Sequence, residues 1–187
     1  MDEKNDVMQK NAFNKKALLI PFIVALIGSL LLILVTFLPF ASANEEHKDY
    51  LEEYSGNMYV QEIDMTNEDA VDISLYEYGR IYAAATDIEM VSDIAITCLV
   101  IICIYGLFSV LVVLFSLLKK AIPIIVFDVL ALADFLLIKW DFSDRGILPN
   151  FNYNWGVAQI ICYIAFAITM VGAIWLLVEK IKIKSKN

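Results

Sequence analysis

The sequence predicts an all-α membrane protein: a bundle of four transmembrane helices with a small, mainly helical extracytoplasmic segment between the first and the second. The chain of 187 residues is 60% hydrophobic and 19% charged, whereas soluble domains are about 45–50% apolar and about 25% charged. The apolar residues form four long runs, and a chain of this length is too short to bury them all in one core. If the chain crosses the membrane four times, most of the basic residues that flank these runs lie on the same face of the membrane.

Three of the four runs are long enough to cross a bilayer unaided. Residues 17–40, 94–118 and 156–178 contain no Asp, Glu, Lys or Arg. Each exceeds the roughly 20 residues that a helix needs to span a hydrocarbon core of about 30 Å. Each is apolar around its whole circumference, as expected of a helix that faces both lipid and other helices.

The third predicted span, residues 121–138, is shorter and contains Asp128 and Asp134. An Asp at the centre of a span costs about 2.5–3.5 kcal/mol on insertion, and each Leu, Ile, Phe or Val returns about 0.3–0.6 kcal/mol. The 12 such apolar residues of this run therefore roughly offset its two aspartates. Because only residues 119–120 separate it from the preceding span, we expect the two to insert together as an antiparallel hairpin.

The distribution of lysine and arginine predicts the orientation of the chain. The tails 1–16 and 179–187 and the turn 119–120 contain ten of the 14 basic residues, and the loops 41–93 and 139–155 contain four. Basic residues concentrate in cytoplasmic segments. We therefore expect both termini in the cytoplasm, both loops outside, and a cell membrane location.

A cleaved signal sequence is the alternative topology for the N-terminal part. Ala41-Ser42-Ala43 resembles a signal-peptidase site and follows an apolar run with a basic flank. Cleavage there would leave three spans and an outer N-terminus at Asn44. The apolar run has 24 residues, however, and the apolar part of a signal peptide has about 7–15, so we favour an uncleaved first span.

The first outer loop is strongly acidic and contains signals for local structure. Between Asn44 and Ser92 it has 13 acidic and two basic residues, a net charge of −11. A helix is expected over residues 44–55 with Asn44 as its N-cap, followed by a short strand over residues 58–65. Two capping boxes come next, Thr66-x-x-Asp69 and Ser74-x-x-Glu77. The second is expected to begin another helix.

Three acidic residues of the first loop share one helix face. Glu45, Asp49 and Glu53 lie at positions i, i+4 and i+8 of the expected helix. Carboxylates so arranged could hold Ca²⁺. A solvated acidic face explains the same pattern, and we favour that interpretation. The sequence contains no signature of a bound cofactor.

The second outer loop, residues 139–155, is short and aromatic, with Trp140 and Trp155 near its ends. Tryptophan concentrates where a membrane meets water. We expect this loop to lie on the membrane interface and to pack under the larger loop.

Asp128 and Asp134 are the functional candidates inside the apolar runs, because an ionisable group within a bilayer marks a functional position by default. They are six residues apart, which separates them by about 120° around a helix, so they are not expected to share one site. One interpretation is a proton or cation relay. The other is a carboxyl group that binds a hydroxyl of a neighbouring helix and holds the bundle together. The candidate hydroxyls are those of Thr97, Tyr105, Ser109, Tyr163 and Thr169.

The cysteines and the absence of acceptor sites for glycosylation bear on the source of the chain. Cys98, Cys103 and Cys162 all lie in apolar runs, and neither outer loop contains a cysteine or an Asn-x-Ser/Thr sequence. No disulfide framework is therefore expected. We infer a bacterial cytoplasmic membrane.

Function is constrained mainly by what the sequence lacks. It contains no H-E-x-x-H, P-loop, G-x-S-x-G or dinucleotide-binding motif, which disfavours an enzyme, and no signature of nucleic-acid binding. We expect a non-enzymatic interaction, accessory or scaffold protein whose partners are the lipid bilayer, a protein at the acidic loop and other copies of the chain. The alternatives are a small transporter, channel or transporter subunit that uses Asp128 and Asp134, and a membrane sensor or immunity-type protein.

The layout of four spans, a larger first outer loop, a two-residue inner turn and a smaller second outer loop resembles that of claudin-like tetraspan proteins. Claudins carry a Trp…Gly-Leu-Trp…Cys…Cys pattern in the first outer loop, and residues 41–93 contain neither tryptophan nor cysteine. The resemblance is therefore one of topology, and it implies no site residue in this chain.

Overall fold

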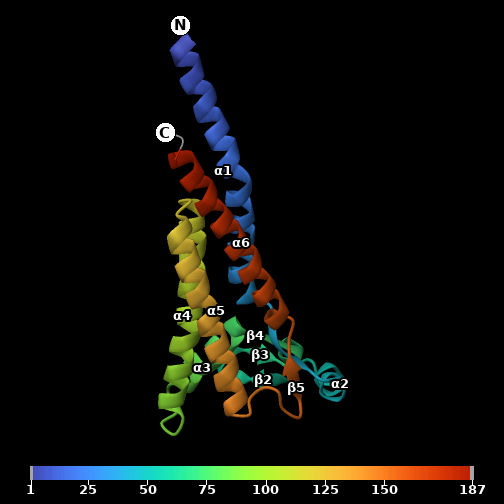
Figure 1. Ribbon diagram of the computed structural model, residues 1–187. Coiled ribbons are helices and arrows are strands. Elements are labelled where there is room, and N and C mark those ends of the chain that lie inside the picture. Colours follow the sequence, from blue (N-terminus) through green and yellow to red (C-terminus); the bar gives the residue numbers. More distant parts are fainter. Residues whose placement is uncertain (1, 186–187) are drawn as a thin grey trace.

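Four long helices dominate the fold. The computed structural model describes residues 2–185 and the side chains of residues 17–185. The helices are α1 (Asp2–Val35), α4 (Ser92–Leu117), α5 (Ala121–Asp144) and α6 (Ala158–Ser185) (Figure 1). Each contains a stretch that is long and apolar enough to cross a membrane, judged by length and composition. The expected number of long apolar helices is confirmed.

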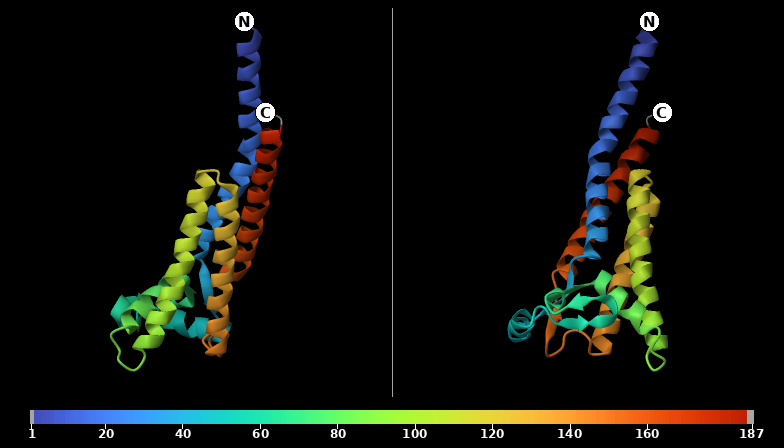
Figure 2. Two further views of the ribbon diagram at one scale, coloured as in Figure 1. Left: turned by 60° about the vertical axis from the view of Figure 1, so that its left-hand side comes forward. Right: turned by 180° about the vertical axis from the view of Figure 1, so that it is seen from behind.

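The helices pack in two pairs, α1 along α6 and α4 along α5. Both termini and the turn between α4 and α5 lie at one end of the bundle, and α1 projects beyond the other helices there (Figures 1 and 2). The remaining segments, residues 36–91 and 145–157, gather at the opposite end. We call them together the cap.

Two glycines let α1 and α6 approach each other at the level of their backbones. A Cβ atom added to Gly28 would lie 2.5 Å from the main-chain nitrogen of Thr169, and one added to Gly172 would lie 2.7 Å from the Cα atom of Ala25. Backbone atoms cannot move aside as the end of a side chain can. Small residues at such crossings are typical of helix pairs in membranes.

The cap contains short strands, two α-helices and two turns of 3₁₀ helix. Its strands are β1 (Pro39–Ala43), β2 (Met58–Val60), β3 (Met65–Thr66), β4 (Asp72–Ser74) and β5 (Tyr153–Trp155). Its helices are α2 (Glu45–Glu53), η1 (Gln61–Ile63), η2 (Asp69–Val71) and α3 (Leu75–Ala85).

A three-stranded antiparallel sheet joins the two predicted outer loops, which are separated in the sequence by the α4–α5 hairpin. The strand order is β4-β1-β5, and Ala41 of β1 pairs with both Ile73 of β4 and Trp155 of β5. The second loop thus packs against the first, as expected. The sheet itself is not anticipated by the sequence, because Pro39 and Phe40 of β1 lie at the end of the first apolar run.

The capping signals of the cap act as expected. The main-chain N–H of His47 donates to Asn44 Oδ1 at 2.9 Å, which begins α2. Ser74 and Glu77 form a complete capping box at the start of α3. Such boxes satisfy main-chain N–H groups that have no partner in the first turn of a helix.

The expected single strand over residues 58–65 is wrong. The chain instead forms β2, the 3₁₀ turn η1 and β3, and the two strands pair as a hairpin. Asp64, between η1 and β3, has a left-handed backbone with φ of 53°. A residue with positive φ breaks an extended strand, and nothing in the alternating pattern of apolar residues predicts it.

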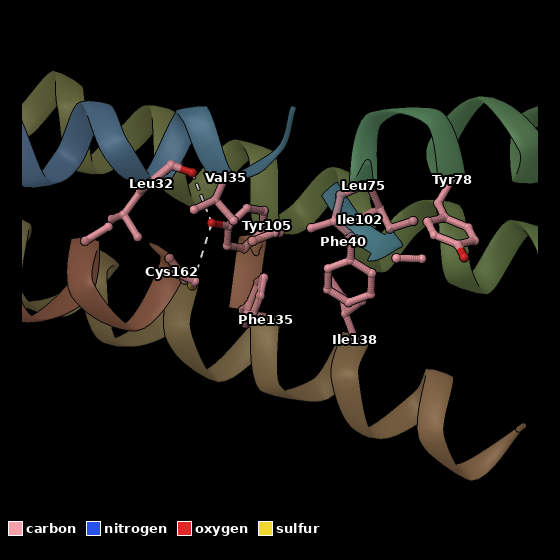
Figure 3. Packing of buried hydrophobic residues seen from close by; sticks show 14 of the residues in the cluster. Leu32, Val35, Phe40, Leu75, Tyr78, Ile102, Tyr105, Phe135, Ile138 and Cys162 are labelled. Atoms are coloured by element: carbon pink, nitrogen blue, oxygen red, sulfur yellow. Dashed lines mark hydrogen bonds between the residues drawn. The ribbon is translucent and has the colours of Figure 1, made fainter. Parts of the chain in front are cut away.

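Phe40 links the cap to the bundle. Its side chain is fully buried and meets four rings edge-to-face, with centroid distances between 5.3 and 6.3 Å. These rings come from α3, α5 and β5, and they belong to Tyr78, Phe135, Phe142 and Trp155. Figure 3 shows Phe40 between the residues of α3 and those of α5.

An ion pair fastens the cap to α5 on another side. Arg145 donates through Nε to Asp141 Oδ1 at 3.0 Å and through Nη2 to Asp141 Oδ2. The same Nη2 group donates to the Tyr82 hydroxyl at 3.2 Å. Burial raises the pKa of Tyr82 to about 12, so the phenol stays neutral and can accept this hydrogen bond.

Candidate functional site

An acidic groove in the cap is the first candidate site. It has a volume of about 640 Å³ and is lined by Lys48, Glu52, Ser55, Glu68, Asp69, Val71, Asp72 and Glu77. Five of these side chains are carboxylates and one is an ammonium group. The groove therefore gathers negative charge from residues that are spread over 30 positions of the sequence, from 48 to 77.

Four elements of the cap and one turn supply the carboxylates. Glu52 comes from α2, Asp69 from η2 and Glu68 from the turn before it. Asp72 begins β4, and Glu77 lies in the first turn of α3. Because β4 pairs with β1 at the centre of the sheet, the groove depends on the same pairing that joins the two loops.

Several of these carboxylates are held in place by hydrogen bonds. Asp69 Oδ2 accepts from the main-chain N–H and the hydroxyl of Thr66, at 2.9 and 2.8 Å. These bonds, the main-chain one above all, lower the pKa of Asp69. Asp72 Oδ1 accepts from the Ser42 hydroxyl at 2.6 Å.

Two further carboxylates face the open part of the groove. Glu52 pairs with Lys48 at 3.6 Å, and both side chains are about half exposed, so this pair contributes little to stability. Glu68 is exposed. An ionised carboxylate only accepts hydrogen bonds, so a ligand of this groove has to supply donors and positive charge.

The three acidic residues expected to share a helix face do so away from the groove. Glu45, Asp49 and Glu53 are all exposed on α2, and none of them lines the groove. Among the described residues, no group of three or more His, Cys, Asp or Glu side chains is arranged to hold a metal ion. The carboxylates that line the groove can accept charge-assisted hydrogen bonds from a cationic organic group, such as the side chain of Lys or Arg.

Asp128 and Asp134 both point into the bundle. Asp128 is 0% exposed and Asp134 is 8% exposed, although they lie on different faces of α5. Both carboxyl oxygens of Asp128 and one of Asp134 have no hydrogen-bond partner among the described residues.

Four of the five hydroxyl groups expected to bind these carboxyls bind main-chain carbonyl oxygens instead. Tyr105 donates to Leu32, and Ser109 donates to Tyr105. Thr97 and Thr169 each donate to the carbonyl four residues earlier on their own helix, and Tyr163 is partly exposed with its ring against Phe135. No polar lock between these hydroxyls and the two aspartates is formed.

Two further buried polar residues were not singled out from the sequence. Gln159, near the start of α6, is 5% exposed, and neither atom of its side-chain amide has a partner within the described part of the chain. Ser116, near the end of α4, is fully buried with an unpartnered hydroxyl. Gln159 is the only amide side chain in the apolar run of residues 156–178. This isolated polar residue could have been identified from the sequence as a candidate.

The aromatic residues of the second loop divide between burial and exposure. Tyr153 is buried, and its hydroxyl donates to the Ala70 carbonyl oxygen at 2.8 Å. Burial raises the pKa of Tyr153, so this donor stays protonated. Trp140 and Phe151 are exposed.

Comparison of the chain with known protein families, with curated proteins and with solved structures finds no match.

Proposed function

We propose that this chain is a non-enzymatic membrane protein that crosses the bilayer four times and uses the acidic groove of its cap to bind a cationic segment of another protein. The four long apolar helices support the crossings. The excess of lysine in the tails and in the α4–α5 turn supports a cytoplasmic position for that end of the bundle. The cap then lies outside the cell.

The groove is the observation that carries this proposal. Its carboxylates converge from four elements and one turn that the sheet and the capping boxes fix in place. A partner that presents lysine or arginine would replace water around these carboxylates with charge-assisted hydrogen bonds. Complementary charge also raises the rate of encounter, and added salt weakens that effect.

A matched pair of double variants tests the proposal. Glu52→Gln with Glu68→Gln removes two charges from the groove, and Asp49→Asn with Glu53→Gln removes two charges from the exposed face of α2. Neither pair takes part in a capping box. The full-length protein in detergent is titrated with a fluorescent oligolysine peptide, and affinity is read from anisotropy.

We expect the groove variant to bind the peptide about 30-fold more weakly, because the loss of two hydrogen bonds at about 1 kcal/mol each removes about 2 kcal/mol of binding free energy. The α2 variant should retain the affinity of the unmodified protein within about twofold. Equal losses in both variants would mean that the peptide responds to net charge alone, and the groove would then have no special role.

A second candidate function is that of a small transporter or transporter subunit. The burial of Asp128 and Asp134 without partners for three of their four oxygens favours it. A buried carboxyl with no fixed partner is available to exchange a proton or to bind a passing cation. Both residues lie on α5, which packs against α4 and α6.

Conservative replacements test the transport function. Asp128→Asn and Asp134→Asn keep the shape of each side chain and remove its acidity. Proton and sodium flux is measured in proteoliposomes that contain the unmodified protein or either variant. Flux that falls in the variants supports transport, and flux equal to that of protein-free liposomes in all three samples refutes it.

A further inference from the structure

Three lysines converge at the end of the bundle that carries both termini. Lys119 and Lys120 lie in the turn between α4 and α5, and Lys180 lies on α6. The Lys180 ammonium donates a hydrogen bond to the main-chain carbonyl oxygen of Lys119. Lys120 and Lys180 also line one cavity.

No carboxylate neutralises this group of lysines among the described side chains. The three salt bridges of residues 17–185 are formed by other basic residues. Glu179, the neighbour of Lys180 in sequence, accepts from Lys182 at 2.8 Å. Neighbouring positive charges repel each other. An anion bound between these lysines would therefore stabilise them.

The ammonium group of Lys119 has a contact of its own with α1. The backbone of Lys119 has a left-handed φ of 54°, and its ammonium group lies 4.6 Å from the centre of the Phe22 ring of α1. This cation–π contact holds Lys119 against α1. Lys120 and Lys180 remain beside the space between α5 and α6.

A cavity of about 180 Å³ lies in that space, lined by Lys120, Ala121, Ile122, Pro123, Leu177 and Lys180. Its lining is of two kinds, because two of the residues are lysines and the other four are apolar. Ile122 is exposed and Leu177 is partly exposed, so the apolar side continues onto the outer surface of the helices. No side chain caps the first turn of α5, which leaves main-chain N–H groups at the same position.

We propose that this cavity binds the headgroup of an anionic phospholipid. The ammonium groups of Lys120 and Lys180 donate to the phosphate oxygens, and the acyl chains follow Ile122 and Leu177 along α5 and α6. A basic pocket between helices at the cytoplasmic surface is the setting in which proteins bind anionic lipid headgroups. The apolar wall favours a lipid over free phosphate, because inorganic phosphate has no apolar part to bury.

This inference relies on the proposed membrane crossings but not on the acidic groove. Topology is measured separately by cysteine labelling, and the groove is tested by peptide binding. A failure of lipid binding with intact topology therefore refutes the lipid site alone.

The test compares ligands on the purified full-length protein in a neutral detergent. Short-chain phosphatidylglycerol, short-chain phosphatidylcholine and inorganic phosphate are titrated separately, and the shift of the thermal unfolding midpoint gives each affinity. We expect phosphatidylglycerol to bind and the other two to bind at least about tenfold more weakly. Equal shifts with phosphatidylcholine would overturn the role of negative charge, and saturation by inorganic phosphate would overturn the assignment to a lipid.

Single lysine variants locate the binding position. Lys120→Gln and Lys180→Gln should each weaken phosphatidylglycerol binding about fivefold, the effect of one lysine near an anionic lipid surface. Lys184→Gln is the matched control, since it removes the same charge one turn further along α6. If Lys184→Gln weakens binding as much as the other two, the attraction is diffuse and the proposed site does not exist. Should Lys180→Gln fail to fold, Lys120→Gln decides the matter, because that side chain is exposed.

Discussion

Tyr105 of α4 donates its phenolic hydrogen bond to the main-chain carbonyl oxygen of Leu32 in α1, at 3.0 Å and away from solvent (Figure 3). Leu32 lies in the last turn of α1. The N–H of Thr36, which would continue the helix by binding this oxygen, binds the carbonyl of Ile33 instead. A carbonyl oxygen left free at a helix end needs another partner, and Tyr105 supplies it from a different helix.

Replacing Tyr105 with Phe should therefore destabilise the bundle. The variant removes the donor and leaves the Leu32 oxygen buried without a partner, which costs about 1–3 kcal/mol. Unfolding in mixed micelles of increasing SDS content gives the free energy of unfolding. Tyr163→Phe is the control, because Tyr163 is 40% exposed, and a loss as large in the control as in Tyr105→Phe would contradict the account.

The close approach of α1 and α6 predicts a difference between two glycines. Gly172→Ala places a Cβ atom against the backbone of Ala25, so the helices have to separate, and the expected loss is about 1–3 kcal/mol, as for other overpacked cores. Gly106→Ala on α4 meets nothing within 4 Å and should be neutral or stabilising by up to about 1 kcal/mol. The same unfolding measurement compares both variants. Equal effects would show that α1 and α6 are not packed as described.

The ring cluster around Phe40 predicts that this residue links the stability of the cap to that of the bundle. Phe40→Ala removes a fully buried ring from contact with α3, α5 and β5, at an expected cost of about 3–5 kcal/mol. Proteolysis of the cap in detergent should accelerate together with unfolding of the helices. Phe151→Ala, at a residue 97% exposed, should change neither rate, and faster proteolysis in that control would contradict the assigned packing.

Asp69 predicts a pH dependence of cap stability. Hydrogen bonds from Thr66 hold the pKa of this carboxyl below its ordinary value of 3.8. Its contribution to stability is therefore complete above the ordinary pKa and is lost as the pH falls through the lower, folded-state pKa. Asp69→Asn should be less stable than the unmodified protein near neutral pH, and the difference should vanish in strong acid.

Unfolding of both proteins is followed at several pH values by tryptophan fluorescence, to which Trp155 of β5 contributes. The other carboxylates are present in both proteins, so their contributions cancel in the difference in stability between the two. A difference that stays constant from neutral pH to strong acid would show that the Thr66 hydrogen bonds do not favour the ionised form.

The helices were predictable because their signals are local. A long run of apolar residues predicts a long helix even when the exact ends of the helix are uncertain from the sequence. Asn44 and the Ser74–Glu77 box mark the first residues of helices through hydrogen bonds that span only three residues. The antiparallel hairpin of α4 and α5 was likewise predictable, because only two lysines separate the two apolar runs.

The sheet and the groove were not predictable, because they depend on residues far apart in sequence. Ala41 pairs with Trp155 across more than a hundred positions, and no local pattern distinguishes β1 from the end of an apolar helix. The acidic character of the cap was visible in its composition, but the residues expected to act together, Glu45, Asp49 and Glu53, are separate from those that line the groove. The burial of both Asp128 and Asp134 likewise depends on how the four helices pack.

The central claim is that four crossings place the cap on one side of the membrane and the α4–α5 turn on the other. Labelling of intact cells with a membrane-impermeant maleimide tests it, in a protein whose Cys98, Cys103 and Cys162 are replaced by alanine. A cysteine introduced by Gly56→Cys, at a position with nothing within 4 Å of an added Cβ atom, should react in intact cells. A cysteine introduced by Lys120→Cys should react only after the membrane is made permeable. Labelling of both positions in intact cells, or of Lys120→Cys alone, would contradict the account.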